Sequence, residues 1–228
     1  MKVLGLLLIS FFCLHSQAIE PLITKKGKIS FDRDFNDNKP LNPKIWKGVQ
    51  EARWSVVDGV VFGQPSSEES RKKITAAQKA AGSKKAGRSH IGNYARLNFW
   101  KTPNETIIEM KIKFKGGNVS DNAYYRVIEL GTHNARIQFR PDKTIMYANK
   151  NSETLDEKPW ILAEDTYCTL LFEIKGKDFC IQIENGPTLR GSSDTFLTKA
   201  RHGKLNLFGA KEGNVYIDHL KIWEAESK

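Results

Sequence analysis

The sequence predicts an all-β, antiparallel sandwich of two sheets, with one short inserted helix and a removable leader in front. Two observations predict the sheets. Downstream of residue 90, short runs alternate between apolar and polar residues, which is typical of strands with one buried face. Turn residues separate these runs at short intervals, and many short strands with frequent turns indicate a sandwich or barrel, not a βαβ fold. The length of 228 residues suits one such domain.

The first eighteen residues have the order of a secretory signal peptide. Lys2 gives a positive start, residues 3–12 are nearly all apolar, and Ser16 and Ala18 are small. We therefore expect cleavage after Ala18 and a secreted or periplasmic domain formed by residues 19–228. The apolar run covers about 10 residues, whereas a membrane-crossing helix needs ~20, so no membrane span is expected. A buried N-terminal helix and a lipid anchor at Cys13 are the alternatives.

Alternation places the strands in chain order. Residues 29–35 and 54–63 predict two strands near the N-terminus. The clearest later strand covers residues 108–114, where Ile108 and Met110 point one way and Lys111 the other. The remaining strands are expected around residues 95–99, 127–130, 137–139, 170–174, 179–183, 205–207 and 215–223.

Residues 66–88 interrupt the β pattern as a basic, partly helical insertion. They are rich in Ala, Lys and Gln and poor in β-branched residues, so residues 67–81 predict a short surface helix. Ser66 followed by Glu69 resembles a capping box, and Gly82 is placed to end the helix.

The formal charge of +10 favours a polyanionic partner. Expected export makes an anionic polysaccharide more suitable than nucleic acid. The charge is concentrated, because nine Lys or Arg residues and no Asp or Glu lie between Arg71 and Lys101. This stretch is either a solvated excursion or an electrostatic lip that steers a polyanion.

Two cysteines follow the leader, and their spacing argues against a disulfide. Residues 167–175 and 178–184 read as a hairpin in which Cys180 pairs near Glu173. Cys168 then lies about five positions further along, which is more than ~15 Å at ~3.3 Å per residue, whereas a disulfide allows ~7 Å between Cα atoms. We expect two free thiols with no metal role.

Several stretches resemble known jelly-roll proteins. Residues 29–35, followed by Leu41 and Trp46, resemble the start of concanavalin A-like domains. Residues 54–63 match the Trp-x-Val-x-Asp-Gly-x-x-x-Gly strand pair of the 3-keto-disaccharide hydrolase domain family, formerly a domain of unknown function. Residues 90–114 are similar to that family's central strand, and residues 215–223 are similar to its closing strand.

The resemblance implies a concanavalin A-like, two-sheet antiparallel jelly roll with a concave, sugar-binding face. It does not establish hydrolysis. Recognisable members of the family carry an Asn-Ser-Gly-x-x-x-Arg stretch, whereas residues 121–126 here offer only Asn122 and Arg126 as matches, with altered spacing. Whether this chain is an enzyme therefore stays open.

The carboxylates give no clear pair for glycoside cleavage, which ordinarily uses two carboxyl groups about 5 to 10 Å apart. No Glu-x-Asp-x-Glu strand exists, and Glu109 and Glu129, on mid-sheet strands, are expected to face solvent. A 3-keto sugar is activated beside its ketone, so one base could replace the pair. His133 and Glu129 are the candidates for that base.

A row of polar residues shares one face of the strand that opens after His133: Arg136, Gln138 and Arg140. Arg126 is expected beside them. Guanidinium groups form bidentate bonds to carboxylate and sulfate, so this row either binds such a group or is an ordinary polar outer face.

Tyr94, Arg96, Asn98 and Trp100 share one parity and suit a ligand-facing strand, because a flat ring can stack on a pyranose. Other aromatic residues near polar or loop positions are Tyr124, Tyr125, Tyr147 and Trp160.

The first hypothesis is therefore an exported carbohydrate-binding protein that prefers sulfated or uronic-acid polysaccharide. Its expected contacts are Tyr94, Arg96, Trp100, Arg126, Arg136, Gln138 and Arg140. The alternative is a glycoside hydrolase acting on 3-keto-disaccharides, and a structural surface protein is a third hypothesis.

We expect no cofactor, metal or nucleic-acid partner, since no corresponding motif appears. Asn104 and Asn118 head glycosylation sequons that matter in a eukaryote.

Overall fold

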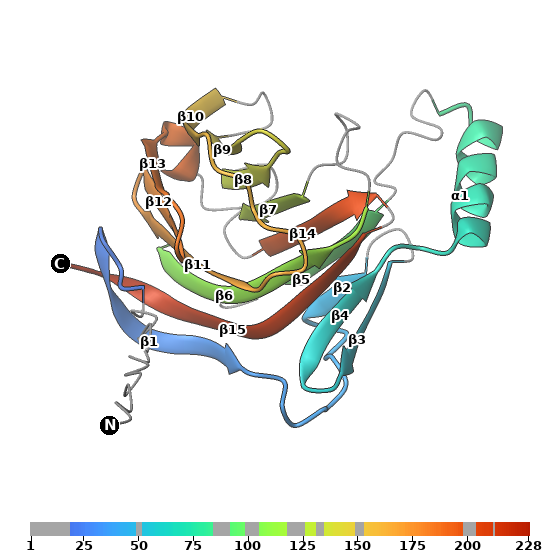
Figure 1. Cartoon of the computed structure of the whole chain (residues 1–228), viewed down its shortest axis with the longest axis horizontal. Coiled ribbons are helices and arrows are strands. Elements are labelled where there is room, and N and C mark those ends of the chain that lie inside the picture. Colours follow the sequence, from blue (N-terminus) through green and yellow to red (C-terminus); the bar gives the residue numbers. More distant parts are fainter. Residues whose placement is uncertain are drawn as a thin grey trace, which may run out of the picture.

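Two antiparallel β-sheets pack face to face, with one sheet curving around the other (Figure 1). The computed structural model describes residues 19–48, 52–83, 92–98, 105–117, 126–130, 135–148, 153–197, 204–211 and 213–228. This architecture confirms the all-β, two-sheet jelly-roll prediction.

We call the curving sheet the outer sheet. Its strands, in spatial order, are β13 (Thr188–Ser192), β12 (Asp178–Ile183), β11 (Cys168–Lys175), β6 (Thr106–Lys115), β15 (Asn214–Ser227), β4 (Val60–Gln64) and β3 (Arg53–Val57). β1 (Thr24–Arg33) pairs with the C-terminal half of β15, from Thr24 opposite Ser227 to Arg33 opposite Leu220. β4 pairs with the N-terminal part of the same strand.

We call the enclosed sheet the inner sheet. Its order is β10 (Glu153–Lys158), β9 (Thr144–Ala148), β8 (Ala135–Phe139), β7 (Arg126–Leu130), β14 (Lys204–Lys211), β5 (Gly92–Asn98) and β2 (Trp46–Gly48). A short 3-10 helix (Asp194–Leu197) follows β13.

The core lies between the sheets and explains the alternation in the sequence. In β6, Ile108, Met110 and Ile112 are buried in the core, and the residues between them face away. In β8, Ile137 and Phe139 enter the same core from the other sheet. Burial of one face of each sheet is the main favourable term in such a sandwich.

One end of the sandwich closes through a glycine. A Cβ placed on Gly191 of β13 would lie 2.5 Å from Cβ of Leu155 in β10. Only a residue without a side chain lets these edge strands, which belong to different sheets, come this close.

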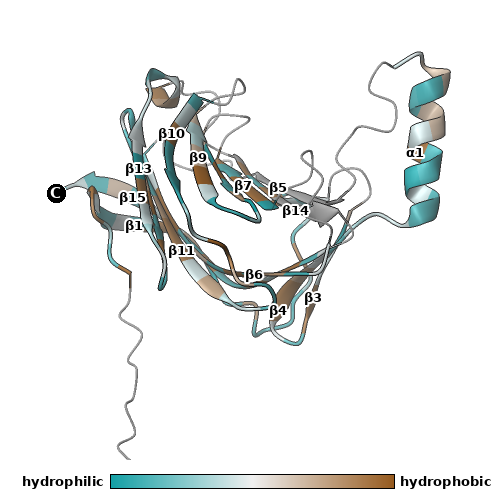
Figure 2. Ribbon diagram, turned by 45° about the horizontal axis from the view of Figure 1, so that its top comes forward, coloured by the Kyte–Doolittle hydropathy of each residue, from teal (hydrophilic) through white to brown (hydrophobic). Residues whose placement is uncertain are grey.

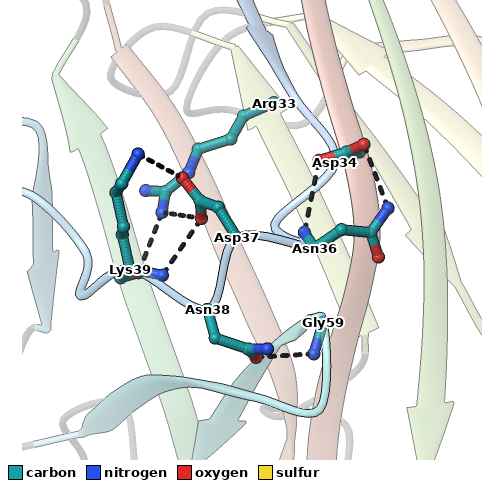
Figure 3. Close-up of polar contacts among 7 residues, drawn as sticks. All are labelled: Arg33, Asp34, Asn36, Asp37, Asn38, Lys39 and Gly59. Carbon is teal, nitrogen blue, oxygen red and sulfur yellow. Dashed lines mark hydrogen bonds and ion pairs between the residues drawn. The ribbon is translucent and has the colours of Figure 1, made fainter.

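The opposite end is fastened by the turn after β1, whose polar contacts Figure 3 shows. Asp37 accepts hydrogen bonds from Arg33 and from the backbone N–H of Lys39, and Asn38 accepts one from the backbone N–H of Gly59 at 2.9 Å. Phe35 has a φ of 61° and is fully buried, in an edge-on contact with Trp46. This left-handed conformation ends β1 at Arg33, so the predicted strand at residues 29–35 is shifted toward the N-terminus.

The predicted surface helix is present as α1 (Glu68–Ala80). Its N-cap is Ser67, which accepts a hydrogen bond from the N–H of Ser70, so the prediction of Ser66 as the cap was wrong by one residue. Ser66 is buried instead. Gly82 follows the helix with a φ of 67°, as a helix end requires. None of the residues of α1 is buried, and the helix stands apart from both sheets with a largely hydrophilic surface (Figures 1 and 2).

The cysteine hairpin has the predicted register, with Cys180 opposite Glu173. Cys168 and Cys180 are separate, buried thiols. Among the described residues, none of the helices has the length and apolar character needed to cross a membrane.

Candidate functional site

The candidate site is the free face of the inner sheet, which is the face turned away from the outer sheet. Strand register identifies its residues, because side chains along a strand alternate between faces. Ile128 of β7 and Ile137 of β8 are opposite each other and point into the core. Their neighbours Glu129 and Arg136 are also opposite each other and therefore point to the free face.

A single cross-strand row runs over the whole width of this face. Each position lies directly opposite the next in the sheet register. From β10 to β2 the positions are Thr154, Tyr147, Arg136, Glu129, Asn206, Arg96 and Lys47. Every position in this row is polar, and the row is buried at its centre, where Tyr147, Glu129 and Asn206 are 4%, 2% and 0% exposed.

Glu129 is the central carboxylate of this row. Its residue is only 2% exposed, and it accepts a hydrogen bond of 2.8 Å from the side-chain amide of Asn206 on β14. The expectation that Glu129 faces open solvent was therefore wrong. A sheet position was recognisable in the sequence, but the burial of that position depends on neighbouring strands that alternation does not specify.

Tyr147, next to Arg136 in the row, contacts two arginines, Arg136 and Arg140. The guanidinium of Arg136 lies 4.8 Å from the centre of the Tyr147 ring. Arg140 donates to the Tyr147 hydroxyl at 2.6 Å and to the side-chain carbonyl of Gln138 at 3.2 Å through two nitrogens. Both guanidinium groups are thus held by neighbours, which reduces the entropy that binding a ligand would cost.

Arg136 and Gln138 share one face of β8, as predicted, while Ile137 and Phe139 are buried on the other. Arg140 follows the end of β8 and is hydrogen-bonded to Gln138. Their role in binding remains a prediction.

Arg126 was wrongly expected beside them. It is opposite Phe139 in the register, and so its side chain lies on the core side of β7. Its residue is 6% exposed, its guanidinium lies 5.7 Å from the Phe114 ring, and it comes within 4.0 Å of a Glu164 carboxylate oxygen. Burial lowers the pKa of the guanidinium, and the nearby Glu164 partly opposes this effect. Arg126 therefore links the two sheets and is removed from the proposed contacts.

The remaining predicted contacts are placed only in part. Tyr94 and Arg96 lie on β5 opposite Phe208 and Asn206 of β14, at free-face register positions. Trp100 and His133 lie outside the described residues, as do Asn104 and Asn118.

Two residues of the site were not among the expected contacts. The sequence does not identify Asn206 as a site residue, because a single Asn in an alternating strand is indistinguishable from a solvent-facing residue. Tyr147 was noted as an aromatic residue near polar positions, and its pairing with Arg136 across β9 and β8 was not visible from the chain. Register prediction would have found both.

The described residues contain no group of three or more His, Cys, Asp or Glu side chains that could hold a metal ion. On the described parts of the central strands β7, β8, β9 and β14, Glu129 is the only carboxylate that the register places on the free face. These strands therefore offer one buried carboxylate flanked by cations and amides, which suits hydrogen bonding to a polar ligand.

Neither a protein-family model nor a curated protein matches the sequence. Solved structures resemble its fold. A protein of unknown function with a galectin-like fold from Bacillus subtilis aligns with a TM-score of 0.64 and 8% identity, covering 90% of this chain and 100% of that chain. A glycosyl hydrolase family protein from Mycobacterium fortuitum aligns with a TM-score of 0.55 and 12% identity, covering 86% and 100%. SCLam, a non-specific endo-beta-1,3(4)-glucanase from family GH16, aligns with a TM-score of 0.58 and 10% identity, covering 90% and 94%.

At these identities the likeness establishes the fold alone. The chain has a two-sheet jelly-roll fold similar to those of the galectin-like and GH16 structures. The likeness to the 3-keto-disaccharide hydrolase family stays a prediction from the sequence.

Proposed function

We propose that this chain is an exported protein that binds a glycan across the free face of its inner sheet. The observation that carries the proposal is the polar row of that face, in which Tyr147, Arg136, Glu129 and Asn206 lie on four adjacent strands. Sugars present hydroxyl groups on their edges, and carboxylates, amides and guanidinium groups are their natural hydrogen-bonding partners. Jelly rolls of this fold include glucanases, which supports a glycan as the ligand.

The charge of the row favours an anionic glycan. Arg136 and Arg140 are already oriented, and Arg96 and Lys47 hold register positions at the other end of the same face. Glu129 is the one opposing charge among the described central positions. A carboxylate or sulfate beside the two oriented arginines would receive charge-assisted hydrogen bonds, which are the strong ones.

Binding to an immobilised uronic-acid polysaccharide tests the proposal. Removing a guanidinium that bonds to a charged group costs roughly 1.5–3 kcal/mol, so Arg136→Ala and Arg140→Ala should each weaken binding about 10- to 150-fold. Tyr147→Phe keeps the ring but releases Arg140, and it should weaken binding less than Arg140→Ala.

The matched control is Arg53→Ala, which removes an exposed arginine from the edge strand β3 of the outer sheet. It should leave affinity within about twofold. Unchanged affinity in both free-face arginine variants would remove these residues from the site, and equal loss in Arg53→Ala would point to net charge alone.

A second candidate function rests on the burial of Glu129. A single carboxylate in a sheltered position could abstract a proton beside the ketone of a 3-keto-disaccharide. Release of a monosaccharide by the wild-type protein, abolished in Glu129→Gln but retained in Arg53→Ala, would support hydrolysis. Absence of sugar release from mildly acid to mildly basic pH would reject it and leave the binding proposal in place.

Export is proposed from the leader pattern of residues 1–18. Mass analysis of the protein recovered from its native host would detect a chain beginning at Ile19. A chain that retains residues 1–18 would contradict this part of the proposal.

A further inference from the structure

Glu173 is a fully buried carboxylate on the side of the outer sheet that faces away from the core. Its neighbours in β11, Phe172 and Ile174, enter the core, so Glu173 projects from the opposite face. A strand residue on that face would normally be exposed to solvent, yet Glu173 is 0% exposed. A buried charge is costly unless hydrogen bonds replace the water that it loses.

The chain's own N-terminal segment supplies those bonds. The backbone N–H of Leu22 donates to one carboxylate oxygen at 2.7 Å. The N–H groups of Ile23 and Thr24 donate to the other oxygen at 2.9 and 3.0 Å, and the Thr24 hydroxyl adds a fourth bond at 2.8 Å. Three consecutive amides therefore converge on one carboxylate.

We call residues 19–24 the strap. Ile19 packs on a small apolar cluster of Ile107, Leu171 and Ala225, which is separate from the main core. The side-chain amide of Gln182 donates to the carbonyl of Glu20 at 2.7 Å. The strap is thus bound to the face of the outer sheet that points away from the core, and none of its residues belongs to the core between the sheets.

We propose that Glu173 is a receptor for the strap and that a peptidase can cut the leader only while the strap is undocked. The proposal rests on the export part of the proposed function. The expected cut after Ala18 lies immediately before the strap, and a processing peptidase must hold residues on both sides of the bond extended in its own cleft. Glu20 and Leu22 are already bonded to the sheet in the docked state, so docking and cutting exclude each other.

The same geometry makes the docking reversible without unfolding. The strap packs on the small outer cluster, bonds to Glu173 and Gln182, and has no residue in the main core. Its release therefore exposes little apolar surface, and water can solvate the freed carboxylate. Local opening of this kind has a lower free energy than global unfolding. A precursor can therefore fold its core while its cut site alternates between a closed and an open state.

Cleavage of the full precursor by purified signal peptidase tests this order of events. Denatured wild-type precursor, diluted into the assay, should be cut to a chain beginning at Ile19. Refolded wild-type precursor should be cut at least about tenfold more slowly, which corresponds to about 1.4 kcal/mol for breaking the strap's hydrogen bonds. Refolded Glu173→Ala precursor should recover most of the rate of the denatured chain.

The control is Glu224→Ala, which removes an exposed carboxylate from β15, the strand that pairs with β1, and should behave as wild type. Equal cutting rates for refolded wild type and refolded Glu173→Ala would overturn the proposal. If the denatured precursor is also left uncut, the leader prediction fails and the proposed order falls with it, whereas glycan binding by the free face is untouched.

Hydrogen exchange in the mature chain tests the receptor separately from the leader. Amides of Leu22, Ile23 and Thr24 should be protected in wild type and should exchange about 10- to 100-fold faster in Glu173→Ala, while the Phe172 amide is unchanged. Glu173→Gln keeps one acceptor oxygen and should fall between them, which guards against a misfolded alanine variant. Equal protection in all three proteins would show that Glu173 does not hold the strap.

Discussion

On the outer sheet, Glu109 lies between a histidine and a lysine. One of its carboxylate oxygens is 3.2 Å from Nε2 of His219, and the other is 3.5 Å from Nζ of Lys26. The His219 contact is the main reason that the pKa of Glu109 lies below its usual 4.5, with Lys26 adding to it and burial opposing it. A lowered pKa means that the folded state favours the ionised carboxylate, so its contribution to stability is present above pH 4.5 and is lost as the pH falls through the lowered pKa.

Urea unfolding of wild type and Glu109→Gln at two pH values checks this sign. At pH 6 the variant should be less stable than wild type, because it cannot form the ionised contact. At pH 3 the gap should shrink as the wild-type carboxylate becomes protonated. A gap that widens toward pH 3 would contradict the assigned direction of the pKa shift.

The two buried thiols should be chemically inert in the folded protein. Burial is the main cause that raises the pKa of Cys168 to about 12 and the pKa of Cys180 to about 11, and nearby carboxylates add to it. Since the thiolate is the reactive form, iodoacetamide at pH 8 should label neither site in the native state and both after denaturation. Stoichiometric labelling of the native protein, read by mass spectrometry, would refute this.

At the scale of elements, the approach of β13 to β10 depends on Gly191. A Cβ at this position would sit 2.5 Å from Cβ of Leu155, and backbone-proximal atoms cannot move aside as a flexible side-chain end can. Gly191→Ala should therefore lower the free energy of unfolding by roughly 1–3 kcal/mol in urea titrations. In Gly27→Ala the three atoms nearest the new Cβ all belong to the exposed side chain of Glu226, which can move aside, so a change of less than about 0.5 kcal/mol is expected. Equal effects of the two substitutions would show that the sheet edges can separate freely.

Which elements exist was predictable from the sequence, because a period of two and turn residues are local signals. The hairpin of β11 and β12 has the predicted register, and α1 ends at the predicted glycine. The start of α1 was missed by one residue, since Ser66 and Ser67 are both suitable caps and burial of Ser66 decides between them. The end of β1 was missed because the left-handed conformation of Phe35 is stabilised by partners in the turn and by the core.

The candidate site was only partly predictable, for a physical reason. Alternation correctly placed Arg136 and Gln138 on one face of one strand, although the strand ends before Arg140. Alternation along β8 does not show which residues of the adjacent strand β7 lie on the same face as Arg136. A difference of one position in the pairing changes the face, and Arg126 is opposite the buried Phe139 and so lies on the core side. The row through Glu129 and Asn206 depends on pairing between β7 and β14, which are far apart in the sequence.

At the scale of the whole molecule, the charge of +10 and the exposed helix α1 predict faster capture of a polyanion. The exposed face of α1 carries Lys72, Lys73 and Lys79, and Glu68 pairs with Lys72 at 2.8 Å. Changing these three lysines to Gln should lower the association rate for a sulfated polysaccharide and flatten its salt dependence, with little effect on dissociation. Surface plasmon resonance at two salt concentrations separates the two rates, and a change confined to dissociation would place α1 in direct contact with the ligand.

The pairing of β1 with β15 also sets how the fold bears a mechanical load. Thr24 lies opposite Ser227, so the beginning of β1 and the end of β15 are neighbours at the same corner of the outer sheet. Ladder hydrogen bonds run perpendicular to the strands. A force that draws these two ends apart therefore breaks the hydrogen bonds between β1 and β15 one pair after another, beginning at Thr24 and Ser227. Tension would peel β1 away first and leave the inner sheet, whose described strands do not pair with β1, intact.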